Sequence, residues 1–280
     1  MMRADLFALT ADLEERHWWF TARRRIVKAL IERILPPSRD SLVIDVGCGT
    51  GANIAALADR YACIGIDPSE VAIGFARDRF PSVEFMVGSA PADLGESAER
   101  ADLFLLLDVL EHVEDDFAQF SAIAAAARAG AHILITVPAD PSLWSGHDVS
   151  HGHYRRYESE RLEMIWRGLP LRVRLMSYFN ARLYPVIRAV RGAGRILGTA
   201  SGARGTDLLQ PPAPINGLLE RIFAGETRTL VELLEGRRER GYRRGVSLIA
   251  LLEREAGHFE ARARPPDLPS RPIPRSRSPV

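Results

Sequence analysis

The sequence predicts an α/β fold in which parallel strands alternate with crossover helices, and three observations lead to this prediction. Short aliphatic and β-branched runs, such as residues 42–46 and 101–107, alternate with segments of helical periodicity. The runs are apolar almost throughout, as strands covered by helices on both faces should be. A glycine-rich turn follows the first run, at the edge of the sheet where open α/β folds bind their ligands.

Five strands are expected between Ser41 and Val137, in one sheet with helices on both faces. Their sequences are LVIDV, CIGID, VEFMVG, ADLFLLL and AHILITV, and a helix at about Asp116 to Arg128 precedes the last of them. Residues 1–35 are expected to form a helix before this core, because leucine and isoleucine recur there at helical spacing. Two prolines close that helix.

The second half of the chain is predicted to complete the sheet around an insertion. LRVRLMSYF at 171–179 alternates apolar and polar residues as an edge strand does, and GVSLIALLER at 245–254 resembles another strand. Between them lie two helical stretches, 181–197 and 215–239, joined by a piece rich in glycine, serine and proline. The proline- and arginine-rich residues after 261 are expected to be disordered.

The composition excludes several classes of protein. The chain has 280 residues, of which 46% are hydrophobic and 26% charged, and this fits a folded, water-soluble protein. A formal net charge of +1 disfavours a nucleic-acid partner, and no run of about 18 uncharged apolar residues occurs. Cys48 and Cys63 cannot build a disulfide framework, and the N-terminus does not resemble a signal peptide, so we expect a cytoplasmic protein.

The glycine-rich turn predicts a nucleotide site. Gly47, Gly49 and Gly51 would let the backbone approach a ligand closely, and the helix that follows presents free N–H groups. Asp67 stands at the end of the second strand, where its carboxylate can accept hydrogen bonds from both hydroxyls of a ribose. Together these residues predict that the chain binds an adenosine-containing molecule.

The charge of Asp45 narrows the choice of ligand. Gly47, Gly49 and Ala52 also satisfy the dinucleotide pattern G-x-G-x-x-G/A, so a nicotinamide-dependent oxidoreductase is an alternative. Asp45 lies two residues before the first glycine, where it would repel a pyrophosphate and attract an ammonium or sulfonium group. We therefore favour a cationic ligand.

Four motifs in the first half of the chain follow one family pattern. V-I-D-V-G-C-G-T-G, followed by G-I-D-P-S, G-S-A and L-D-V-L-E-H-V, resembles the class I S-adenosylmethionine-dependent methyltransferases over Ser41 to Val137. The resemblance implies S-adenosylmethionine as cofactor and a Rossmann-like, doubly wound sheet of seven strands, in the order 3-2-1-4-5-7-6 with strand 7 antiparallel. It implies cofactor contacts from Asp45, Gly47, Cys48, Gly49, Gly51, Asp67, Pro68, Ser89, Ala90, Asp108 and Val109.

Two further motifs resemble a bacterial subgroup of this family. Its chains open with E-x-H-W-W-F-x-x-R-R, here residues 15–24, and share T-V-P-x-x-x-x-L-W-S-x-H-D, here residues 136–148. Ubiquinone-pathway O-methyltransferases are more distant relatives. We therefore divide the chain into an N-terminal helical lid at 1–37, a methyltransferase core at 38–179 and 245–260, a helical insertion between strands 6 and 7 at 180–244, and a disordered tail at 261–280.

The aromatic residues of the N-terminal motif leave two alternatives open. His17, Trp18 and Trp19 could form a lid that stacks over the cofactor, or they could anchor the N-terminal helix to the sheet. Under the first alternative, Trp19 contacts the cofactor and Arg23 pairs with the cofactor's carboxylate.

The loop after the fifth strand is the expected substrate side, because open α/β sheets bind ligands beyond the carboxyl ends of their strands. In one interpretation, His147 or His153 is a general base that removes a proton from the acceptor. In a second, these two residues bind a metal ion with Asp148 and His151, and in a third the loop is a structural ion-pair network. We expect no metal ion, and we expect substrate contacts from Trp144, Arg155, Arg156 and Tyr157.

These observations predict an S-adenosylmethionine-dependent methyltransferase that moves a methyl group, by in-line displacement, to a hydroxyl of a small-molecule or lipid-linked acceptor. The alternatives are a nicotinamide-dependent oxidoreductase and a non-catalytic partner subunit that binds the cofactor. The first helical stretch of the insertion mixes apolar residues with arginines, so peripheral contact with the inner face of a membrane is left open. The sequence defines neither the acceptor atom nor the oligomeric state.

Overall fold

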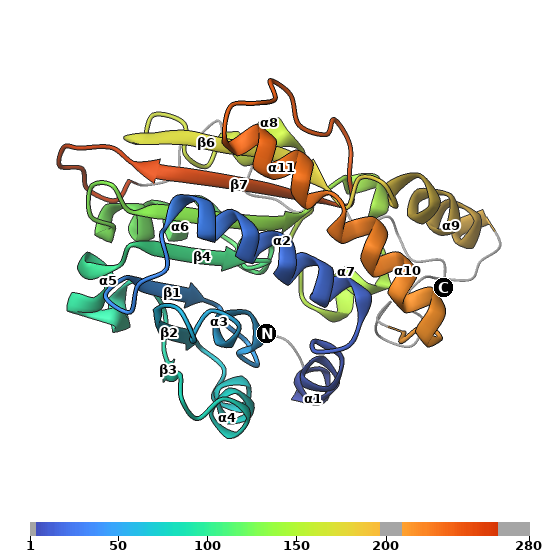
Figure 1. The fold of residues 1–280 in the computed structure, drawn as a ribbon, viewed down its shortest axis with the longest axis horizontal. Coiled ribbons are helices and arrows are strands. Elements are labelled where there is room, and N and C mark those ends of the chain that lie inside the picture. Colours follow the sequence, from blue (N-terminus) through green and yellow to red (C-terminus); the bar gives the residue numbers. More distant parts are fainter. Residues whose placement is uncertain (1–3, 197–208, 263–280) are drawn as a thin grey trace.

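A seven-stranded sheet forms the centre of the molecule (Figure 1). The computed structural model describes residues 4–196 and 209–262. The strand order is β3-β2-β1-β4-β5-β7-β6, and β7 runs antiparallel to both of its neighbours, so the predicted fold is confirmed. The strands are β1 (Leu42–Val46), β2 (Ala62–Asp67), β3 (Glu84–Val87), β4 (Leu103–Leu107), β5 (His132–Pro138), β6 (Leu171–Phe179) and β7 (Ser247–Arg254).

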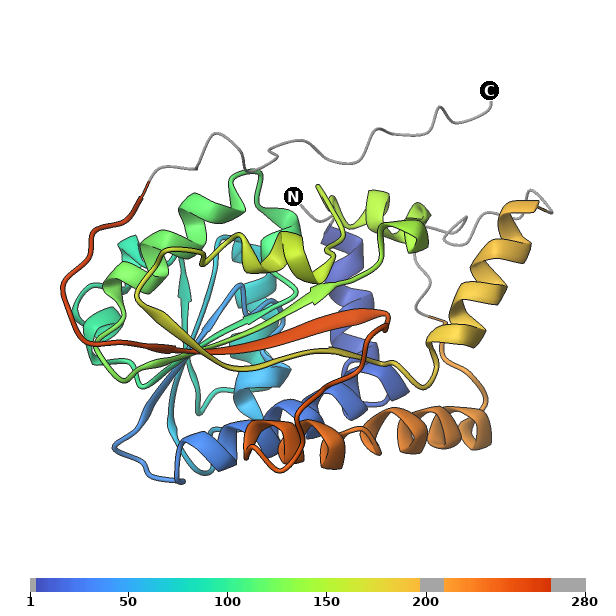
Figure 2. The same ribbon diagram turned by 90° about the horizontal axis from the view of Figure 1, so that it is seen from above.

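Helices cover both faces of the sheet, as Figure 2 shows. Successive side chains of a strand point to opposite faces. In β4, Phe104 and Leu106 therefore join one apolar layer while Leu103 and Leu105 join the other. The first layer is covered by α5 (Glu96–Arg100), α6 (Asp116–Ala126) and α8 (Ser159–Glu163), and the second by α2 (Trp18–Ile34), α3 (Ala52–Ala55), α4 (Glu70–Arg79), α10 (Ala213–Ala224) and α11 (Thr227–Leu234).

The N-terminal segment forms two helices rather than the single predicted one. α1 (Ala4–Leu13) ends before a break, and α2 begins after His17, whose Nδ1 accepts a hydrogen bond from the N–H of Trp19 at 3.3 Å. Such a cap satisfies a backbone N–H that has no partner in the first turn of a helix. α2 buries Ile26 and Leu30 in the second apolar layer, so it packs directly on the sheet. Its role as part of a lid stays a prediction.

The insertion between β6 and β7 packs beside α2 through two of its helices, α10 and α11. It contains α9 (Tyr184–Ile196), α10 and α11, so the second predicted helical stretch is divided at Gly225 and Glu226. Glu226 is buried, and its Oε1 accepts the N–H groups of Ala181 and Arg182 at 2.8 Å each. Residues 197–208 of the joining piece and most of the predicted disordered tail, 263–280, lie outside the described residues.

The short helical segments gather in the connections between strands. η2 (Leu110–His112) follows β4, and both η3 (Pro141–Leu143) and α7 (Gly146–Ser150) follow β5, so these three lie at the carboxyl end of the parallel strands. η1 (Ala92–Leu94) follows β3. Within residues 4–196 and 209–262, no helix combines the length and the apolar character needed to cross a bilayer.

Candidate functional site

The turn between β1 and α3 holds three glycines in a left-handed backbone conformation. φ is +69° at Gly47, +54° at Gly49 and +89° at Gly51, a region that residues with a Cβ rarely adopt. A Cβ at Gly47 would lie 2.8 Å from a methyl carbon of Val109, and one at Gly51 would lie 2.8 Å from the ring of Phe85. A Cβ at Gly49 would meet no atom of the described residues within 4 Å. The turn is therefore packed at both ends and open in the middle, where a ligand can approach the backbone.

Asp67 is held in place beside this opening. Its Oδ2 accepts the N–H of Gly49 at 3.0 Å, and its Oδ1 accepts the N–H of Ser69 at 2.9 Å. Burial raises the pKa of the Asp67 carboxyl, while the two backbone donors lower it. A carboxylate accepts about four hydrogen bonds, so each oxygen retains capacity for a further donor such as a ribose hydroxyl.

Two carboxylates and one arginine lie close to the turn. Asp45, in β1, is 1% exposed, and its Oδ2 has no hydrogen-bond partner in the described part of the chain. Burial raises the pKa of Asp45 to about 8, although the positive charge of Arg23 lowers it. Arg23 is itself buried, which lowers its pKa to about 10, and it forms an ion pair with Asp108 after β4. Asp108 also accepts the hydroxyl of Thr136 at 3.2 Å.

The two tryptophans of the N-terminal motif have different surroundings. Trp19 lies against Arg23, with the guanidinium carbon 4.4 Å from the ring centroid. The ring of Trp18 packs against Phe223 of α10, with 6.2 Å between the ring centroids. The backbone N–H of Trp18 donates to Oδ1 of Asn216 at 2.9 Å. Trp18 thus links α2 to the insertion, whereas Trp19 stays close to Arg23. The cofactor contacts of Trp19 and Arg23 stay predictions.

A contact that the sequence did not predict joins the N-terminal segment to the turn. Glu14 is buried, and its Oε1 accepts the hydroxyl of Thr50 at 2.8 Å and pairs with Arg79 of α4. Arg79 also donates to the carbonyl of Thr50 at 3.1 Å. Thr50 belongs to the glycine turn, so the segment after α1 fixes the turn directly. The N-terminal motif pointed to this region of the chain, because it begins at Glu15, which also forms an ion pair with Arg79.

The other predicted cofactor residues lie in the connections at the same end of the sheet. Cys48 is buried, and burial raises the pKa of its thiol well above the usual range. Ala90 is buried, Val109 is half-buried, and Pro68 and Ser89 are exposed. Their contacts with a cofactor stay predictions.

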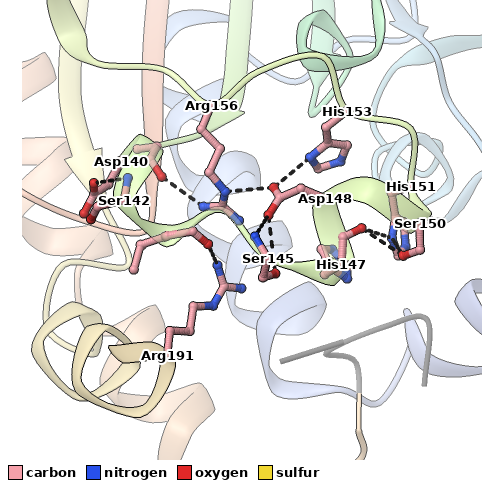
Figure 3. A network of polar contacts seen from close by, with 12 residues as sticks. Asp140, Ser142, Ser145, His147, Asp148, Ser150, His151, His153, Arg156 and Arg191 are labelled. Carbon is pink, nitrogen blue, oxygen red and sulfur yellow. Dashed lines mark hydrogen bonds and ion pairs between the residues drawn. The ribbon is translucent and has the colours of Figure 1, made fainter. Parts of the chain in front are cut away.

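Asp148 organises the loop after β5 (Figure 3). Its Oδ1 accepts the Nε–H of Arg156 at 2.8 Å and lies 3.0 Å from Nδ1 of His153, and its Oδ2 accepts the N–H of Ser145 at 2.8 Å. Burial alone would raise the pKa of Asp148, but the contact with His153 and the charge of Arg156 hold it well below its usual range. The carboxylate is therefore ionised and holds His153 in a fixed orientation.

Four imidazoles meet at this loop. The ring centroids of His147 and His151 are 3.9 Å apart, and each is 6.1 Å from that of His153. His112 comes from η2, and its ring centroid is 4.6 Å from that of His153. The sequence grouped the three histidines of the loop but not His112, which is distant from them along the chain.

Three of the predicted substrate residues are buried and engaged within the protein. Arg155 donates to two carbonyls between η2 and α6, at 2.5 and 2.7 Å, and Tyr157 donates to Oδ2 of Asp116 at 2.9 Å. Arg156 donates to Asp148 and is also buried. These contacts fix the loop to the neighbouring connection and to α6. Trp144 is half-buried, and substrate binding by these four residues stays a prediction.

Glu111 is a further residue of the site, and the sequence left open whether it faces the cleft or the helix behind it. It is fully buried in η2, and neither carboxylate oxygen has a hydrogen-bond partner among residues 4–196 and 209–262. Burial raises the pKa of Glu111 to about 8, while its own backbone N–H and the charges of Arg23 and Arg156 lower it. Arg23 thus acts on both Asp45 and Glu111, so the glycine turn and the histidine loop share one electrostatic environment.

Comparison with known protein families and sequences gives a consistent result. Residues 19–184 match a family model described as a methyltransferase domain. The ubiquinone biosynthesis O-methyltransferase of Stutzerimonas stutzeri is 30% identical over 37% of this chain and 47% of that protein. The trans-aconitate 2-methyltransferase of Paracidovorax citrulli is 31% identical over 41% of this chain and 45% of that protein. The chain thus spans less than half the length of these curated relatives.

Several solved structures share the fold. One is a chain in the complex between the Haloferax volcanii Trm112 methyltransferase activator and a methyltransferase, with a TM-score of 0.56 at 17% identity over 91% of this chain and 97% of that chain. Another is the plantazolicin methyltransferase BamL, with 0.53 at 12% identity over 90% and 91%. The [4+2]-cyclase SpnF gives 0.51 at 15% identity over 84% and 81%. At these identities the likeness shows the fold alone, and a fold does not define a reaction.

The burial of Asp45 predicts a pH-dependent loss of stability. Its pKa is raised from 3.8 to about 8 in the folded chain, where Arg23, Asp67 and Glu14 are the charged groups that act on it. The folded state binds the extra proton in this interval, so the free energy of unfolding falls as the pH rises from about 4 to about 8. We expect Asp45→Asn to leave stability unchanged near pH 4 and to raise it at pH 8 by more than about 1.4 kcal/mol, the equivalent of one pKa unit.

Chemical denaturation at several pH values measures this difference. Asp40→Asn is the matched control, because Asp40 is exposed in the turn before β1. If the stability of Asp45→Asn and of the wild-type protein depended on pH in the same way, the carboxyl of Asp45 would not be desolvated as described.

Proposed function

Because the chain belongs to the methyltransferase-domain family, we propose that it is an S-adenosylmethionine-dependent enzyme that methylates a hydroxyl of a small-molecule or lipid-linked acceptor. The observation that carries the proposal is the open glycine turn with an oriented carboxylate at its side. Gly49 has space for a ligand against the backbone, and Asp67 is fixed by two backbone donors. The curated relative in Stutzerimonas stutzeri, named as an O-methyltransferase, supports a hydroxyl acceptor.

The residues around the turn fit S-adenosylmethionine by their chemistry. Asp67 offers acceptors to the two hydroxyls of a ribose. Asp45 carries a buried oxygen that lacks a partner among the described residues, and a cationic ligand would satisfy it. The anionic pyrophosphate of a nicotinamide dinucleotide would offer no positive charge to the Asp45 carboxyl group and would raise its pKa further. When bound, S-adenosylmethionine supplies a methyl group that is activated on a sulfonium.

The chain's own contribution is to position the acceptor and remove its proton. His153 is oriented by Asp148, as a general base is oriented by a third group in many nucleophilic sites. His147 lies next to it on the same loop, and either imidazole is a candidate to accept the proton of a hydroxyl. Trp144, half-buried on this loop, is a candidate to pack on the acceptor, and Arg155 and Tyr157 fix the loop. Alignment of the acceptor in a dry site supplies the rest of the rate enhancement.

The surface of α9 supports a lipid-linked acceptor and peripheral contact with a membrane. Val186 and Val190, one helical turn apart, are 62% and 63% exposed. Arg188 and Arg244 line a hollow of about 650 Å³ at the start of this helix. Exposed apolar side chains flanked by arginines are typical of helices that lie on an anionic membrane. The hydroxyl of Tyr184 in α9 donates to Oδ2 of Asp140 at 2.7 Å. Asp140 lies in the connection after β5, so this bond joins the helix to the histidine loop.

Cofactor binding is tested by calorimetric titration with S-adenosylmethionine and with NAD. We expect S-adenosylmethionine to bind and NAD to give no heat. Asp67→Ala should weaken the binding of S-adenosylmethionine at least tenfold, because hydrogen bonds to a charged group contribute about 1.5–3 kcal/mol. Asp59→Ala is the control, since Asp59 is an exposed carboxylate in the connection between α3 and β2. Binding of NAD in place of S-adenosylmethionine would establish the oxidoreductase alternative instead.

The general base is tested by transfer of a labelled methyl group from S-adenosylmethionine into lipid and small-molecule fractions of a cell lysate. We expect the double variant His147→Ala, His153→Ala to lose about 10²–10⁴-fold in rate, the usual contribution of a general base, while the affinity for S-adenosylmethionine is retained. His258→Ala is the control, because His258 is exposed. Full activity of the double variant at every pH would rule out both residues as the base. An inactive wild-type protein that binds the cofactor would favour the partner-subunit alternative.

Membrane contact is tested by co-sedimentation with phosphatidylglycerol vesicles. We expect the wild-type protein to bind at low salt and less at high salt, since screening weakens attraction to anionic lipid. Val186→Glu with Val190→Glu should reduce the bound fraction severalfold, and Val71→Glu on α4 serves as the control because Val71 is also exposed. If the wild-type protein did not bind the vesicles at low salt, the proposed contact of α9 with a membrane would be contradicted.

A further inference from the structure

The buried carboxylate of Glu111 has no task in the proposed methyl transfer. Neither oxygen has a hydrogen-bond partner in the described part of the chain, and the side chain is fully buried. A buried carboxylate is strongly disfavoured unless it is protonated or paired with a cation. The arginines whose charges act on Glu111 are directed elsewhere, because Arg23 pairs with Asp108 and Arg156 with Asp148. Without a further cation Glu111 therefore stays protonated near neutral pH, and a cation bound beside its two oxygens would let it ionise.

Two histidines complete a set of metal ligands with Glu111. One ring nitrogen of His112, one ring nitrogen of His153 and one oxygen of Glu111 lie within 4.8 Å of one another. Two imidazoles and one carboxylate are the protein ligands of many zinc and non-haem iron sites, which keep further positions for water or substrate. His112 is exposed whereas Glu111 is buried, so an ion can enter from the side of His112.

The surroundings of His153 resemble those of metal-bound histidines. Such residues almost always donate the second ring N–H to a carboxylate or a carbonyl, which fixes the ring and the tautomer. Nδ1 of His153 lies 3.0 Å from Oδ1 of Asp148, and Asp148 is held in turn by Arg156 and Ser145 (Figure 3). With its Nδ1–H donated to Asp148, His153 presents the lone pair of Nε2 as a metal ligand.

We propose that Glu111, His112 and His153 bind a divalent first-row metal ion, with Zn²⁺ as the reference species. From the sequence we expected no metal ion, and the ligand set considered there, His147, Asp148, His151 and His153, differs from this one. The charges of Asp45 and Glu111 both act on Arg23, so this site lies beside the glycine turn. An ion there would polarise an acceptor hydroxyl and lower its pKa, which leaves His147 as the proton acceptor. The metal site itself does not depend on methyl transfer.

Zn²⁺ binding to the full chain tests the proposal. The purified protein is treated with a chelator, dialysed and titrated calorimetrically with Zn²⁺, and the bound metal is counted by mass spectrometry. We expect one ion per chain in the wild-type protein. Glu111→Gln and His153→Gln should each lower the affinity at least 100-fold, and Asp148→Asn should lower it about 10–100-fold, as expected for the loss of an orienting carboxylate. The Co²⁺-loaded protein should show ligand-field absorption that Glu111→Gln changes.

His132→Gln is the matched control, because His132 also lies near a glutamate, Glu253, but in β5 away from this cluster. Circular dichroism and S-adenosylmethionine titration show whether each variant is folded. Lack of stoichiometric Zn²⁺ binding by the wild-type protein would overturn the proposal, as would equal binding by folded Glu111→Gln and His153→Gln. Zn²⁺ binding without S-adenosylmethionine binding would support the metal site and contradict the proposed methyl transfer. S-adenosylmethionine binding without Zn²⁺ binding would contradict the metal site and support the proposed methyl transfer.

Discussion

Buried carboxyl groups at the carboxyl end of the sheet, gathered around Arg23, are the constraint on which the site depends. Asp108 pairs with Arg23, whereas Asp45 and Glu111 keep oxygens without hydrogen-bond partners among the described residues. Burial raises the pKa of both groups to about 8, so they stay protonated near neutral pH unless a cation accompanies them. A sulfonium ligand at the glycine turn and a metal ion at η2 would each supply the missing positive charge. Both proposals therefore rest on the same feature at two neighbouring places, a buried carboxyl group that needs a cation in order to ionise.

The segments outside the parallel strands hold this arrangement in place. α2 carries Arg23 and Trp19, and its apolar side packs on the sheet together with α10 and α11. Glu14 joins the glycine turn to α4 through Thr50 and Arg79. Asn216 of the insertion accepts the N–H of Trp18 at the start of α2. The N-terminal segment and the insertion are thus continuous with the core that positions the charges.

Local patterns predicted the strands and the turn, because those depend on neighbouring residues. β6 occupies 171–179 as expected, and the glycines adopt the left-handed conformation that their turn requires. The meeting of Glu111 with His153 depends instead on the packing of two distant connections, which no local pattern encodes. Arg155 and Tyr157 were predicted as substrate residues because their loop lies beyond the carboxyl end of the fifth strand, and that role stays a prediction. Their burial follows from Asp116 on α6, a pairing that only the fold reveals.

Binding of the nucleoside at the glycine turn is tested most directly by a crystal structure with S-adenosylhomocysteine. The expected result is that both ribose hydroxyls donate to the carboxylate of Asp67, while the ligand backbone passes Gly49 and its amino group faces Asp45. A nucleoside bound elsewhere on the molecule, with the turn between β1 and α3 clear of the ligand, would contradict the proposed site.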